Sequence, residues 1–122
     1  MQNYFLGADA DPARSLDARK HRRIPFLAQG KVLLRPQPIV VTIRNLSFSG
    51  LRFECAARFD LGKPITLLVS GELDGRPFDE TVEGRVMAIR RGAGEHAYGL
   101  QFTTLLSPER QPHLTALLSQ HV

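Results

Sequence analysis

The sequence has few of the residues that form metal sites and disulfides, and it lacks the long apolar runs of membrane helices. Its 122 residues include no tryptophan, four histidines and one cysteine. A single cysteine excludes an internal disulfide and a zinc site with several cysteine ligands. The histidines are scattered without paired acidic residues, so we expect no metal and no cofactor. No stretch approaches the roughly 18 consecutive apolar residues of a membrane helix, and the first residues lack a signal-peptide pattern. We therefore expect a cytoplasmic protein without membrane insertion.

Catalytic signatures are also missing. The chain contains neither G-x-S-x-G nor H-E-x-x-H,. Gly92 and Gly94 fall in a turn between two expected strands, and no G-K-[ST] follows them, which excludes a phosphate loop. Cys55 alternates onto the apolar side of its segment and is interpreted as a buried structural thiol. We expect a binding protein and not an enzyme.

The composition that is present fits one globular domain. Hydrophobic residues make up 43% of the chain and charged residues 23%, which allows a single core. The net charge of +4 and the pI near 9.8 indicate anionic partners. There is no long basic tail, so this charge permits binding of nucleic acid without requiring it.

Apolar residues recur with period two through most of the chain, which is typical of strands. Asp74-Gly75 marks a hairpin turn, because both residues tolerate a positive φ. Six strands joined by short turns predict an all-β protein, namely a small six-stranded antiparallel β-barrel. The expected strands cover residues 26–35, 39–44, 51–55, 64–69, 81–88 and 98–102.

The C-terminal part has a different period. Leu114, Leu117 and Leu118 recur at helical spacing after a helix-start pattern at residues 107–109,. Because Pro112 would cost a backbone bond inside a helix that began at 108, we expect an α-helix from about residue 112, packed on the barrel. The expected organisation is a flexible leader (1–18), a barrel with its basic arm (19–105) and the helix region (106–122).

The basic arm carries Arg19 and Arg23, in an R-x-x-x-R spacing. Their Cα atoms would lie about 13 Å apart in an extended segment and about 6 Å apart in a turn or helix. Only the curled form lets both side chains bind one compact ligand. The arginine fork binds phosphate oxygens and the O6/N7 edge of guanine in a bidentate manner. The alternative is a solvated basic segment, to which Lys20 and Arg22 add charge without specificity.

A second polar element, N-x-S-x-x-G, lies between two apolar runs and contains Asn45, Ser47 and Gly50. Strict alternation from Ile43 would turn Asn45 and Ser47 inward. A register slip near Arg44 would instead bury Leu46 and Phe48 and leave the polar pair on the outer wall. We favour the slip, because an unpaired buried amide costs roughly 1–3 kcal/mol. Gly50 suits a positive φ or a close backbone approach, and a plain polar hairpin is the alternative reading.

The two elements, in this order, resemble the PilZ family of bacterial cyclic di-GMP receptors. The resemblance covers nearly all of residues 19–105. It also includes Arg23-Ile24-Pro25-Phe26, similar to the family's transition from arm to first strand, and Gly99-Leu100-Gln101-Phe102, similar to its G-x-x-F signature.

The resemblance implies a six-stranded barrel with a C-terminal helix and a site for cyclic di-GMP. Arg19 and Arg23 would hold phosphates and the Hoogsteen edges of guanine, and Asn45, Ser47 and Gly50 would take the roles of the second motif. It implies an adaptor that signals to an unidentified downstream protein in motility, pilus or exopolysaccharide control. The alternatives are a ligand-free interaction module and a small basic barrel that binds nucleic acid. The aromatic residues fall mostly at core-facing positions, which argues against nucleic acid as the partner.

Overall fold

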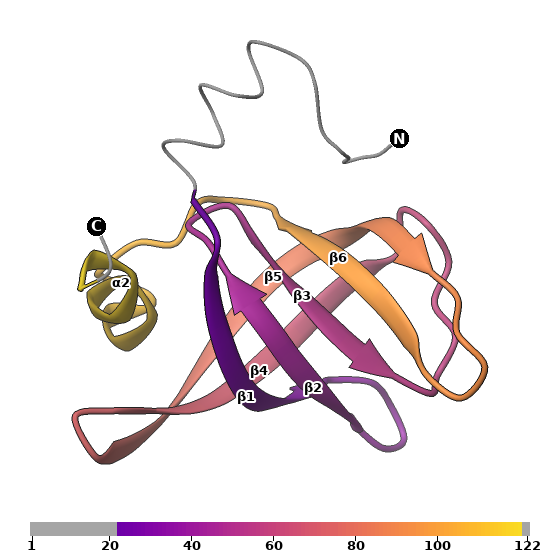
Figure 1. The fold of residues 1–122 in the computed structure, drawn as a ribbon, viewed down its shortest axis with the longest axis horizontal. Helices are drawn as coiled ribbons and strands as arrows, with labels where there is room; N and C mark the ends of the chain where they lie inside the picture. The colour runs from indigo at the N-terminus through magenta and orange to yellow at the C-terminus, as the bar shows by residue number, and fades with distance from the viewer. Residues whose placement is uncertain (1–21, 121–122) are drawn as a thin grey trace, which may run out of the picture.

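The computed structural model describes residues 22–120. Six antiparallel strands close into a barrel in the order β1-β2-β3-β6-β5-β4, and one helix follows them (Figure 1). The prediction of an all-β barrel is confirmed. The elements are β1 (Ile24–Val32), β2 (Ile39–Leu46), β3 (Gly50–Cys55), β4 (Pro64–Leu73), β5 (Arg76–Arg90), β6 (His96–Phe102) and α2 (Pro112–Ser119).

The core fills the inside of the barrel with every second residue of each strand. This alternation places Leu51, Phe53 and Cys55 of β3 inside, as predicted, and leaves Arg52 and Glu54 on the outer wall. Burying an apolar side chain of this size contributes about 1.5–3 kcal/mol, so the pattern by itself determines which face turns inward. The largest fully buried side chains are Tyr98, Phe53, Ile43, Leu46, Leu51, Leu67, Leu100 and Leu114.

Strand β1 begins and ends earlier than predicted, at Ile24 and Val32. Pro25 lies inside it, although proline cannot donate a ladder hydrogen bond,. Pro25 is tolerated because β1 pairs with β4 only between Gln29 and Val32. The first half of β1 therefore has β2 as its only strand partner within residues 22–120.

The turn between β4 and β5 has the predicted conformation. Asp74 and Gly75 have φ values of 54° and 79°. Two successive positive φ angles match the right-handed twist of a hairpin. Residues 64–73 and 76–85 then pair along the whole length of β4.

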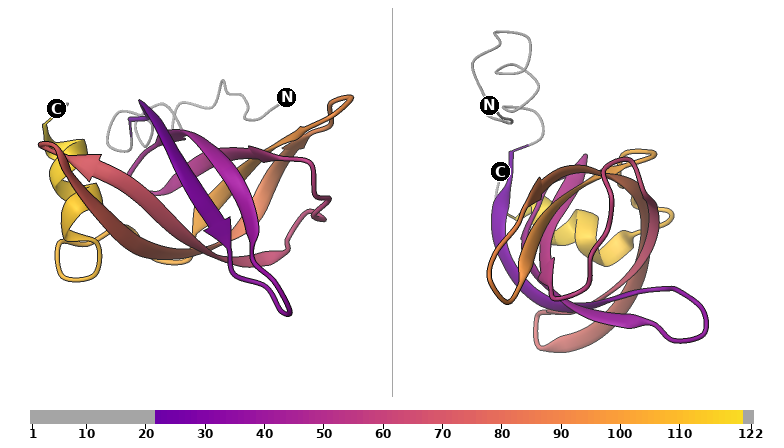
Figure 2. Two further views of the ribbon diagram at one scale, coloured as in Figure 1. Left: turned by 90° about the horizontal axis from the view of Figure 1, so that it is seen from below. Right: turned by 90° about the vertical axis from the view of Figure 1, so that its right-hand side faces the viewer.

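Helix α2 begins at Pro112, as predicted, and lies across one end of the barrel (Figure 2). Its leucines Leu114, Leu117 and Leu118 are buried, which confirms that this stripe packs on the barrel. No helix within residues 22–120 has the length and apolar character required to cross a membrane.

A buried carboxylate on β5 holds the start of α2. Glu80 accepts hydrogen bonds from the backbone N–H groups of His113 (2.7 Å) and Leu114 (2.9 Å). Its Oε2 atom also lies 2.6 Å from His113 Nδ1, and the His113 ring stacks on Phe78 with centroids 4.8 Å apart. The first N–H groups of a helix have no hydrogen-bond partner within the helix. Gln111, the residue before α2, supplies no side-chain cap, so the Glu80 carboxylate takes that role.

Candidate functional site

The pairing of β1 with β2 brings the two polar elements of the sequence together. Ile24 pairs with Leu46 and Pro25 pairs with Asn45, so the residue before β1 lies beside the end of β2. Arg23 Nη1 donates a hydrogen bond of 2.8 Å to Asn45 Oδ1 across 22 residues of sequence. Arg19 and Lys20 lie outside the described residues, so the arrangement of the full R-x-x-x-R spacing stays a prediction.

Asn45 lies on the outer wall because β2 contains the expected irregularity. The register with β3 shifts between Ile43 and Asn45. As a result Ile43 and Leu46 are both fully buried, while Asn45 is partly exposed. Phe48 is only partly buried and packs against the core. The prediction of a slip near Arg44 is confirmed, and its physical cause is the burial of Leu46.

Ser47 does not lie on the outer wall, and that part of the prediction is wrong. Its exposed fraction is 1%. Its Oγ atom accepts hydrogen bonds from the backbone N–H groups of Ser49 (3.2 Å) and Gly50 (3.1 Å). The hydroxyl is buried without penalty because it satisfies the backbone of the turn between β2 and β3. Ser47 thus determines the shape of the turn that presents Asn45.

Gly50 is required by a close backbone approach. A Cβ atom at this position would lie 2.4 Å from the carbonyl oxygen of Leu100 on β6. A real Cβ cannot come so close to an oxygen, so only glycine fits here without moving β3 away from β6. Of the two reasons that the sequence left open for this glycine, close approach is the one that applies.

The turn at residues 47–50 is also bonded to the segment that leads to α2. The Ser49 carbonyl accepts a hydrogen bond from Phe102 N (2.8 Å), and the Phe48 carbonyl accepts one from Leu106 N (3.0 Å). Four residues after Leu106, the segment reaches Arg110 and then the start of the helix. The candidate site and α2 are therefore connected by one short, hydrogen-bonded segment.

Positive charge surrounds Asn45 on the outer wall. Arg22 and Arg23 are exposed just before β1, and Arg52 of β3 pairs directly with Asn45. Arg44 is different, because its Nε atom lies 3.0 Å from Glu54 Oε1 in a salt bridge. Guanidinium groups beside an exposed amide suit an anionic ligand that also has base edges to recognise.

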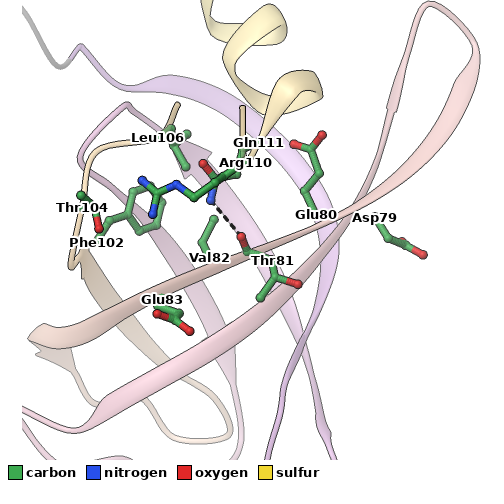
Figure 3. A pocket seen from close by; sticks show the side chains of 10 residues that line it. All are labelled: Asp79, Glu80, Thr81, Val82, Glu83, Phe102, Thr104, Leu106, Arg110 and Gln111. Carbon is green, nitrogen blue, oxygen red and sulfur yellow. Dashed lines mark hydrogen bonds between the residues drawn. The ribbon is translucent and has the colours of Figure 1, made fainter. Parts of the chain in front are cut away.

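A cavity of about 430 Å³ lies elsewhere, between β5 and residues 102–111 (Figure 3). The carboxylates of Asp79, Glu80 and Glu83 line it, together with one guanidinium, that of Arg110. Gln111 Nε2 donates to the Thr81 carbonyl (3.0 Å) at its edge. Three carboxylates disfavour the binding of a phosphate ligand, and none of the predicted ligand residues that the structure describes (Arg23, Asn45, Ser47 and Gly50) lines this cavity.

The remaining reactive side chains are structural within the described part of the chain. Burial raises the pKa of the Cys55 thiol, which keeps it protonated and unreactive,. His96 is buried and its Nδ1 accepts a hydrogen bond from Gly92 N (3.2 Å). Among residues 22–120, no three His, Cys, Asp or Glu side chains are grouped so that they could hold a metal ion.

Glu80 is a functional residue of the fold that the sequence motifs did not predict. The residue occupies an inward position of β5, between the buried residues Phe78 and Val82. A carboxylate on an apolar strand face is a signal that a buried partner exists. The alternation of β5 therefore contained this information, although the identity of the partner, the start of α2, did not follow from it.

Comparisons with known proteins agree with this geometry. The family model of the PilZ domain matches residues 17–120. The comparison with curated proteins finds no significant match.

Solved structures with the same fold include two that cover 84% of this chain at 15% sequence identity. One is the Bacillus subtilis inhibitor of motility MotI/DgrA, with a TM-score of 0.69. This chain covers 51% of that protein, or about half its length. The other is the PilZ domain of YcgR from Escherichia coli with c-di-GMP, with a TM-score of 0.64 and 89% of that chain covered.

Proposed function

Because this chain belongs to the PilZ domain family, which is a family of cyclic di-GMP receptors, we propose that it binds cyclic di-GMP on the outer wall beside Asn45. The observation that carries the proposal is the 2.8 Å hydrogen bond between Arg23 and Asn45. It supports a site in which the arginine arm and the second motif act on one ligand.

The proposed site contains Arg19, Arg23, Asn45, Ser47 and Gly50. Arg19 and Arg23 hold phosphates and the guanine edges through their planar guanidinium groups. Asn45 both donates and accepts at a guanine edge. Ser47 and Gly50 contribute through the turn, since they hold the backbone on which Asn45 is presented.

The proposed mechanism is electrostatic capture followed by ordering of the arm. Binding draws Arg19 and Arg23 onto the barrel wall beside Asn45 and Ser47, so the ordering step concerns the part of the chain that carries the two arginines. Fixing this part against the barrel costs free energy that binding must offset. We expect a micromolar or somewhat tighter complex, about −8 to −10 kcal/mol.

The proposed output is a new surface made by the arm, the ligand and the barrel, which a partner protein recognises. In the family, motility, pilus and exopolysaccharide machineries are the usual partners. The turn at 47–50 supports such an output because its carbonyl groups are bonded to the segment that leads to α2. An adaptor without catalytic activity fits these features.

Binding of nucleic acid is the second candidate, and the aromatic residues argue against it. Single-strand binding uses exposed aromatic rings on which bases stack. Within residues 22–120, six of the aromatic side chains are buried and Phe48 is partly buried. No stacking platform is therefore exposed on the described part of the barrel.

Isothermal titration with cyclic di-GMP tests the proposal. We expect saturable binding by the wild type, and a loss of roughly 2–4 kcal/mol for each arginine removed. The variant Arg19→Ala/Arg23→Ala should therefore show no measurable binding. Lys20→Ala/Arg22→Ala is the matched control, since it also removes two positive charges, and it should bind within a few-fold of wild type.

GTP serves as the ligand control and should not bind. If the wild type does not bind cyclic di-GMP, the receptor function is wrong and the chain is a ligand-free interaction module. If the two double variants weaken binding equally, the arm contributes charge alone, and Arg19 and Arg23 are not specific ligand residues.

A further inference from the structure

Asn45 has a second arginine beside it, on the side away from Arg23. Arg52 of β3 pairs directly with Asn45 of β2. Directly opposite residues in an antiparallel pair have Cβ atoms about 4.5–5.5 Å apart. Leu51 and Phe53 are fully buried, so the side chain of Arg52 points to the outer wall. The outer wall thus carries Arg23, Asn45 and Arg52 side by side, with Arg23 just before β1, Asn45 on β2 and Arg52 on β3.

Arg52 differs from its neighbour Arg44 in its partners. Arg44 is paired with Glu54 at 3.0 Å, and Glu54 is also the nearest carboxylate to Arg52 along β3. No hydrogen bond or ion pair involves the Arg52 side chain within the described residues 22–120. The Arg44 guanidinium is therefore neutralised by Glu54, whereas the Arg52 guanidinium, opposite Asn45, has no such carboxylate partner within residues 22–120.

On the β6 side of Arg52, the outer wall of the barrel has only small residues. The partner of Arg52 on β6 is Gly99, which pairs in turn with Ala88 of β5. Glycine has no side chain and alanine only a methyl group, too short to cover the guanidinium from that side, and Arg52 is partly exposed. A flat ligand that lies over Asn45 can extend across this strip and still meet the charge of Arg52.

We propose that Arg52 is a further ligand-binding residue, which takes a phosphate of the bound dinucleotide from the side of Asn45 opposite to Arg23. This inference rests on the proposed function and adds a residue that neither polar motif contains. Arginine suits the role because its fork donates two parallel hydrogen bonds to phosphate oxygens.

The test compares Arg52→Gln with Arg44→Gln in titrations with cyclic di-GMP at two salt concentrations. Both variants lose one charge on the same wall. We expect Arg52→Gln to weaken binding about ten- to a hundredfold, the range for a hydrogen bond to a charged group. Arg44→Gln should change it less than threefold, because Glu54 already neutralises that charge. The salt dependence should become shallower for Arg52→Gln alone.

Arg52→Lys provides the second variant. It keeps the charge but lacks the fork, so its affinity should lie between those of wild type and Arg52→Gln. Thermal unfolding without ligand should give the same midpoint for all variants, since both side chains lie on the outer wall. Equal affinity of Arg52→Gln and wild type overturns this inference alone, whereas a wild type that does not bind overturns the proposed function as well.

Discussion

Two residues of the second motif act through the backbone of one turn. Ser47 satisfies the N–H groups of Ser49 and Gly50, and Gly50 lets the turn approach Leu100. Asn45 alone among the three presents its side chain on the outer wall. At the scale of residues, the motif is therefore one outward-facing side chain on a turn that the other two residues stabilise.

Gly50→Ala tests this view at the level of stability. The added Cβ would lie 2.4 Å from the Leu100 carbonyl oxygen, so β3 and β6 must separate, at a cost of about 1–3 kcal/mol. Urea denaturation measures the change in the free energy of unfolding. Gly94→Ala is the control, because its Cβ meets no atom within 4 Å, and it should stay within about 1 kcal/mol of wild type. Equal stability of the two variants would contradict the close approach.

His96 makes the free energy of unfolding depend on pH. Burial, then the charges of Arg91 and Arg58, lower its pKa in the folded protein. In the unfolded chain the pKa returns to about 6.5, so below that pH the unfolded state binds more protons than the folded state. The stabilising contribution is complete above pH 6.5 and declines as the pH falls toward the lowered pKa.

Urea denaturation at several pH values between 8 and 5 measures this effect. Wild type should lose free energy of unfolding below about pH 6.5, and His96→Gln should lose less over the same interval. Parallel pH profiles for the two proteins would show that His96 does not contribute to acid sensitivity.

At the scale of elements, helix α2 depends on a partner from the sheet. Gln111, the residue before the helix, makes no side-chain cap. The carboxylate of Glu80 supplies the missing acceptors for His113 and Leu114. The helix is short, eight residues, so its stability comes from this anchor and from its buried leucines more than from its own propensity.

Glu80→Ala should therefore loosen α2. We expect a loss of about 1.5–3 kcal/mol in the free energy of unfolding, the range for hydrogen bonds to a charged group. Hydrogen exchange should be faster at the amides of α2 in this variant. Glu83→Ala, on an exposed position of the same strand, is the control and should leave both quantities near the wild-type values. Unchanged exchange in Glu80→Ala would mean that the leucines alone hold the helix.

At the scale of the whole molecule, closure of the barrel determines where charged side chains can lie. A closed sheet pairs most of its strand edges and buries one face of every strand. The outer face is then available for charged side chains, and those around Asn45 are mostly positive. This division explains how a chain with one small core can also present the positively charged candidate site.

Much of this arrangement was predictable from local patterns. The alternation in residues 51–55 predicts the inward face of one strand, and Asp74-Gly75 predicts one hairpin turn. The structure confirms both. The register slip near Arg44 was also predictable, because burying the apolar side chain of Leu46 is more favourable than burying the amide of Asn45. The burial of Ser47 was not predictable. It depends on hydrogen bonds between the Ser47 hydroxyl and the N–H groups of the turn, and the alternation of apolar residues does not describe the geometry of a turn.

The sequence by itself determined the class of fold, the inward faces of the strands and the two polar elements, because period, turn chemistry and motif spacing are properties of adjacent residues. The tertiary structure alone decided which distant residues meet. It placed Arg23 beside Asn45, Arg52 opposite Asn45, Gly50 against Leu100 and Glu80 under α2. Strand register and barrel closure set these contacts, and both result from packing across the whole chain.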